Sequence, residues 1–142
     1  MADLMRPDDL KKISNDAEMK KAQEYLARAK KQEDEQAALR EAFMHAEIGP
    51  EAHERVNSAV RRAAEQGNHH VQIITFPASY CNDGGRRINN SEPDWPNSLE
   101  GFAKKAYEFY EKELKPIGYR AHVEIIDYPG GIPGNIGMFL KW

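Results

Sequence analysis

The chain has 142 residues, a formal net charge of −3 and one cysteine. This length is typical of a single domain with one modest core, and the missing excess of Lys and Arg argues against a nucleic-acid partner. One cysteine excludes an intramolecular disulfide framework, and no apolar run approaches the roughly 20 residues that span a bilayer, so we expect a cytoplasmic protein with no membrane contact.

The composition changes near Gly67-Asn68. Residues 1–67 carry 26 charged side chains and two aromatic residues, whereas residues 68–142 carry 17 charged and 11 aromatic residues. We therefore expect a charged helical arm over 1–67 and a small α/β domain over 68–142.

The arm sequence predicts two helices. From about residue 8 to 47 the chain is rich in Lys, Glu, Gln and Ala and contains no Gly or Pro, which favours a helix. Gly49-Pro50 ends it, and a second helix is expected over about 51–66. Together they predict an N-terminal helical hairpin.

Apolar residues recur along the first helix at helical spacing, but residues 30–36 are all polar or charged and interrupt this apolar stripe. The heptad pattern therefore holds for too few turns to indicate a long coiled coil. The thin apolar face of the second helix should need another surface, which is the first helix, the sheet or a second protomer. For the arm as a whole we favour a partner that completes the burial, either another protein or a second copy of this chain in a homodimer. The candidate partner-binding residues of the arm are Tyr25, Leu26, Leu39 and Phe43.

The second half predicts an α+β fold. A buried strand is followed by a long polar loop, a strongly amphipathic helix, an alternating strand and a final strand. We expect a three-stranded β-α-β-β domain with a mixed sheet, in which the first two strands run parallel and the last two form a hairpin. The expected bounds are about 70–76 for the first strand, 77–97 for the loop, 98–115 for the helix, and 119–128 and 136–142 for the other strands.

Two loops at one sheet edge form a candidate ligand site. If the first two strands are parallel, the loops 79–90 and 127–135 leave the sheet at the same edge, where ligands bind in open α/β sheets. Glycine amides and guanidinium groups there could hold a carboxylate or a phosphate. The candidate ligand-binding residues are Cys81, Asp83, Gly84, Gly85, Arg86, Arg87, Asp127 and Tyr128.

No catalytic signature accompanies these loops. Cys81 could act as a nucleophile, but the sequence places no base for it, and a lone cysteine is more often a small buried apolar residue. The spacing of the five histidines gives no metal site, and we predict no metal and no cofactor. Trp95, in the polar loop, is expected either to pack onto the domain or to anchor a partner.

Two functions are therefore expected. The first is a non-enzymatic interaction, adaptor or regulatory protein that uses the helical arm to bind a partner or itself. The alternative is a small domain that binds an anionic ligand, or acts on it, through the two loops. The sequence resembles no known family that would decide between them.

Overall fold

The computed structural model describes residues 3–142 and has an α+β fold, as predicted. The chain divides into two compact units, of which the first ends at Glu41 and the second comprises Ala42–Trp142. The change of composition predicts the boundary at residue 67. None of the helices in residues 3–142 is long and apolar enough to cross a membrane.

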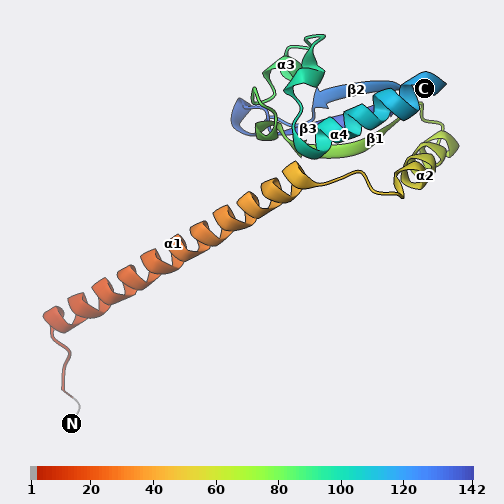
Figure 1. Cartoon of the computed structure of the whole chain (residues 1–142). Coiled ribbons are helices and arrows are strands. Elements are labelled where there is room, and N and C mark those ends of the chain that lie inside the picture. The colour runs from red at the N-terminus through yellow and green to blue at the C-terminus, as the bar shows by residue number, and fades with distance from the viewer. Residues whose placement is uncertain (1–2) are drawn as a thin grey trace. The chain divides into compact units, whose positions relative to one another are not determined.

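Helix α1 extends from Pro7 to His45 and is continuous over its whole length (Figure 1). It has no buried residue, and over its whole length its apolar side chains do not gather on one continuous side. A helix of this kind gains little from packing within its own chain, since a buried face requires an apolar stripe on one side.

The sheet contains β1 (His70–Pro77), β2 (Arg120–Ile125) and β3 (Asn135–Lys141) in the order β1-β3-β2 (Figure 1). Both neighbouring pairs are antiparallel, so the expected mixed sheet is wrong. The cause is the position of β3, which lies between β1 and β2 and separates two strands that run in the same direction. β3 is the most buried of the three strands, and its run Ile136–Leu140 contains no charged residue, which suits the centre of the sheet.

One face of the sheet carries the core. On β3 the side chains of Ile136, Met138 and Leu140 are fully buried on this face. Helix α4 (Gly101–Phe109) contributes Ala103 and Ala106 to the same core. A π-helical turn, Tyr110–Leu114, and a 3₁₀ turn, Lys115–Ile117, extend α4, and Tyr110 and Leu114 pack with Leu140.

Helix α2 (Ala52–Glu65) belongs to the second unit and packs beside β1. Val56 and Val60 lie against the core cluster of Leu140 and Tyr110. The helical hairpin that we expected from the first two helices is not confirmed, because the apolar face of α2 is buried by the domain that follows it.

The long polar loop after β1 is built from short helical pieces. They are a 3₁₀ turn at Ala78–Tyr80, helix α3 (Arg86–Asn89) and a second 3₁₀ turn at Trp95–Ser98. Ile88 of α3 is buried in the core. Backbone hydrogen bonds also run through the loop, including one from Asn82 N to Ser98 O at 2.9 Å. The loop therefore has a defined structure attached to the domain.

Candidate functional site

The loops that follow β1 and β2 meet at one edge of the sheet. Both strands are antiparallel to β3 and so share a direction, which brings their carboxyl ends to the same side. The Tyr128 hydroxyl donates a hydrogen bond to Asn89 Oδ1 at 2.8 Å, which joins the two loops directly. Tyr128 thus lies beside the segment that contains the other candidate ligand-binding residues.

Asp83 organises the turn that begins α3. Its carboxylate accepts hydrogen bonds from the backbone N–H of Gly85 at 2.9 Å and of Arg87 at 3.1 Å. Gly84 and Gly85 have φ values of +68° and +87°, a conformation that glycine adopts without strain. The two glycines therefore shape the turn, and the amide of Gly85 is directed at Asp83 of the same loop.

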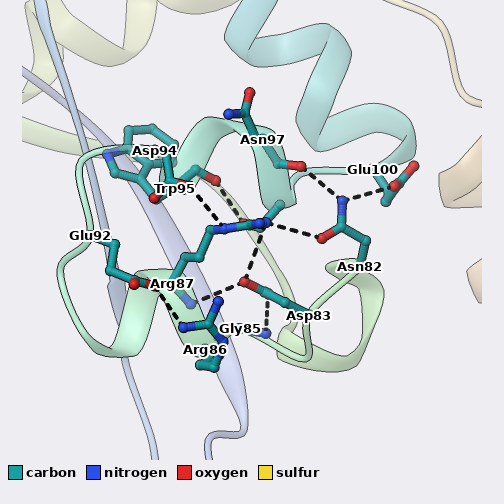
Figure 2. Close-up of polar contacts among 11 residues, drawn as sticks. Asn82, Asp83, Gly85, Arg86, Arg87, Glu92, Asp94, Trp95, Asn97 and Glu100 are labelled. Carbon is teal, nitrogen blue, oxygen red and sulfur yellow. Dashed lines mark hydrogen bonds and ion pairs between the residues drawn. The ribbon is translucent and has the colours of Figure 1, made fainter.

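The two arginines are paired with acidic residues of their own loop (Figure 2). Arg87 Nε lies 3.1 Å from Asp94 Oδ2, and its Nη1 lies 3.8 Å from Asp83 Oδ2. Arg86 Nη1 lies 3.0 Å from Glu92 Oε2. Because each guanidinium already faces a carboxylate, an incoming anion would have to compete with these ion pairs.

Asn82 links the start of the loop to its end (Figure 2). Its side-chain amide donates to Asn97 O at 2.8 Å and to Glu100 Oε1 at 3.3 Å, and its Oδ1 accepts from Arg87 Nη1 at 3.5 Å. Asn82, Glu92 and Asp94 were not among the residues that we selected from the sequence. Glu92 and Asp94 follow the two arginines closely in the sequence, and this proximity was the signal that could have indicated ion pairs within the loop.

Asp127 has a similar role in the second loop. Its Oδ1 accepts a hydrogen bond from Asn135 N at 2.7 Å, and its Oδ2 accepts one from Asn135 Nδ2 at 3.1 Å. These bonds close the connection between β2 and β3 at its base. The polar groups of both loops thus stabilise the loops themselves, and this arrangement gives the anion site less support than their sequence did.

Cys81 is buried in the core beside Phe76 and Leu99. The pKa of its thiol is raised to about 11, chiefly by burial and to a smaller degree by the nearby carboxylates of Asp83 and Glu100, while a hydrogen bond with Ser98 lowers it. A thiol with this pKa is protonated at neutral pH, whereas nucleophilic cysteines are activated as thiolates.

We therefore expect Cys81 of the native protein to resist alkylation by iodoacetamide at pH 8, and to react once urea unfolds the chain. The pKa of the Cys81 thiol in the folded state lies above its ordinary value of 9.0. The free energy of unfolding should therefore fall as pH rises from about 9 to 11, because the unfolded chain loses this proton first. The measurement is mass spectrometry of the labelled protein. Rapid labelling of the native protein would contradict the buried, protonated thiol.

Metal ligands do not gather in the described part of the chain. No group of three or more His, Cys, Asp or Glu side chains in residues 3–142 is arranged to hold an ion. His122 Nε2 lies 3.3 Å from Glu124 Oε2 on β2, with both side chains partly exposed, and this pair has no third ligand among the described residues.

The candidate partner-binding residues fall into two groups. Tyr25, Leu26 and Leu39 of α1 are 72%, 65% and 66% exposed. Phe43, at the end of α1, is packed in the second unit, where its ring centroid lies 4.9 Å from that of Tyr80 and 5.5 Å from that of Phe76.

Trp95 packs within the domain as well. Its ring lies edge-on to that of Tyr107 of α4, with centroids 5.1 Å apart. Of the five residues, the three in the body of α1 are therefore the exposed ones, and they define the surface that a partner could reach.

Comparisons of the chain with protein-family models, with curated proteins and with solved structures returned no match.

Proposed function

We propose that this protein is a protein-interaction module and that helix α1 is its docking element. The observation that supports this most is the distribution of exposed apolar residues. Among the described residues, eight of the twelve large hydrophobic side chains that are exposed lie between residues 4 and 39. They are Leu4, Met5, Leu10, Ile13, Met19, Tyr25, Leu26 and Leu39.

The contrast with the second unit strengthens this reading. Ala42–Trp142 has its own core, built on β3 and covered by α4 and α2, so its stability does not require apolar residues from the part of the chain before Ala42. The part of α1 before Ala42 contributes no residue to a core. Apolar residues exposed on such a helix are unfavourable in solution, and a helix of this kind commonly buries them against a partner. The partner is another protein or a second copy of this chain.

The anion-binding alternative has weaker support. Arg86 and Arg87 face Glu92, Asp94 and Asp83, and the thiol of Cys81 is buried and protonated. A ligand at these loops would therefore have to open ion pairs that hold the loop together. We place the docking function first for this reason.

The test compares the full chain with the variant Tyr25→Ser/Leu26→Ser inside living cells. A lysine-reactive cross-linker reports on the arm directly, since Lys20, Lys21 and Lys30 lie close to these positions along α1. We expect cross-links from the arm to one defined protein, which is the same chain or another, and their loss in the variant. Mass spectrometry of the cross-linked peptides identifies both ends.

The matched control is Asp34→Ser/Glu35→Ser, which changes two adjacent exposed charged residues of the same helix. It should keep the cross-links. Circular dichroism must show equal helix content in both variants, so that loss of contact is not loss of the helix. Cross-links that persist in Tyr25→Ser/Leu26→Ser would overturn the docking function.

A further inference from the structure

Four apolar residues of α1 form a stripe that we name the arm seam. They are Met19, Ala22, Leu26 and Ala29, separated alternately by three and four residues. This spacing places them on one side of a helix, at the a and d positions of two heptads. Met19 and Leu26 are exposed.

The arm seam is complementary to itself when two helices run antiparallel. With a two-fold axis level with Glu24, Met19 of one copy lies opposite Ala29 of the other, and Ala22 lies opposite Leu26. Every layer then holds one long and one short side chain, so the layers have similar volume and can interdigitate. A parallel pair would set Leu26 against Leu26 and Ala22 against Ala22, which gives alternating crowded and empty layers.

The charges favour the same antiparallel register. When the heptads are continued outward in both directions, each charged seam position meets an opposite charge or a neutral polar group, whereas the charged flanking residues Asp9 and Lys11 meet the apolar residues Ala37 and Leu39. A parallel pair in register would instead bring each charged seam residue against its own copy. The seam pairs are Asp8 with Arg40, Lys12 with Gln36 and Asn15 with Glu33. The flanking pairs nearer the axis are Asp16 with Lys30, Glu18 with Gln32, Gln23 with Gln23 and Tyr25 with Tyr25.

We propose that the arms of two copies of this chain pair antiparallel along the arm seam. The proposal rests on the proposed function and names its partner as a second copy. In this register residues 8–40 of both helices overlap, and the overlap ends before Ala42, where the second unit begins. The four apolar layers span only two heptads, whereas a stable coiled coil needs three to four. The dimer should therefore dissociate on dilution.

The test places a single cysteine beside the two-fold axis of the full chain. Gln23 lies at a flanking position next to the axis, so Gln23→Cys should meet the same residue of the second copy. We expect the short bifunctional thiol reagent dibromobimane to convert this variant into a dimer of twice the chain mass. Glu24→Cys is the matched control, because residue 24 lies at the same level on the opposite side of the helix and should give monomer.

Second-site changes test the seam itself. In the Gln23→Cys background, Leu26→Asp should abolish the cross-linked dimer, whereas Ile13→Asp, at an exposed apolar position outside the seam, should keep it. The native chain, whose one cysteine is the buried Cys81, is the negative control and should give no cross-linked dimer.

Equal cross-linking of Gln23→Cys and Glu24→Cys, or none of either at high protein concentration, would overturn the self-pairing. If the arm cross-links found in cells then lead to a different protein, the docking function stands with another partner. If those cross-links also survive Tyr25→Ser/Leu26→Ser, both proposals fail.

Discussion

Gly101→Ala should destabilise the second unit by about 3 kcal/mol, the sum of a strained backbone and a steric clash. Gly101 has a φ of +58° at the start of α4, and a Cβ there would lie 2.7 Å from Met44 Cα and 2.9 Å from Phe43 O. Those atoms belong to backbone that cannot move without withdrawing the Phe43 ring from Tyr80 and Phe76. The end of α1 and the start of α4 would have to separate.

The measurement is urea unfolding followed by tryptophan fluorescence, since Trp95 and Trp142 both lie in the second unit. Gly67→Ala is the matched control, because Gly67 has a φ of +83° but nothing within 4 Å of a Cβ. The free energy of unfolding of this variant should fall by only about 1–2 kcal/mol, the strain of a left-handed conformation at a residue other than glycine. Equal losses in the two variants would show that the contact with Phe43 and Met44 does not constrain the site.

Met138→Ala should cost about 2–5 kcal/mol, the usual range for truncating a fully buried side chain. Met138 lies at the middle of the central strand, where it is paired with Ile74 on one side and Val123 on the other. Its side chain has no solvent exposure. The cavity would therefore open where the two flanking strands and α4 share one core.

The adjacent residue Phe139 supplies the comparison. It lies on the opposite face of β3, between the rings of His70 and His122, and is only partly buried. Phe139→Ala removes a larger side chain but should cost less than Met138→Ala, because water can occupy the space that it leaves. A larger loss for Phe139→Ala in the same urea experiment would indicate that the outer face of the sheet is covered after all.

The fold class could be predicted from the sequence, but the strand order could not. Helical and alternating apolar spacings gave the α+β class, which the structure confirms. The mixed sheet was wrong because we assumed that consecutive strands are neighbours, and here β3 separates β1 from β2. The composition of β3 held a usable signal, since Ile136–Leu140 contains no charged residue while both flanking strands carry polar or charged side chains on their outer face.

The candidate site shows what spacing cannot determine. Helical spacing assigned Phe43 to an exposed stripe with Leu39, but whether the end of a helix is buried depends on distant rings such as that of Phe102. In the same way, a loop sequence does not tell whether Arg87 is free for a ligand or paired with Asp94, because the path of an irregular loop decides the distance. Both questions are settled by tertiary contacts rather than by local propensity.

The central position of β3 also bears on how the chain folds during synthesis. β3 is the last strand in the sequence, yet it provides every strand pairing that β1 and β2 make. While the ribosome is still translating residues 135–141, β1 and β2 have no strand to pair with, although α1 is complete and needs only local hydrogen bonds. In the nascent chain, helix α1 therefore forms before the sheet can close, and β1 and β2 remain accessible to chaperones until residues 135–141 have left the ribosome.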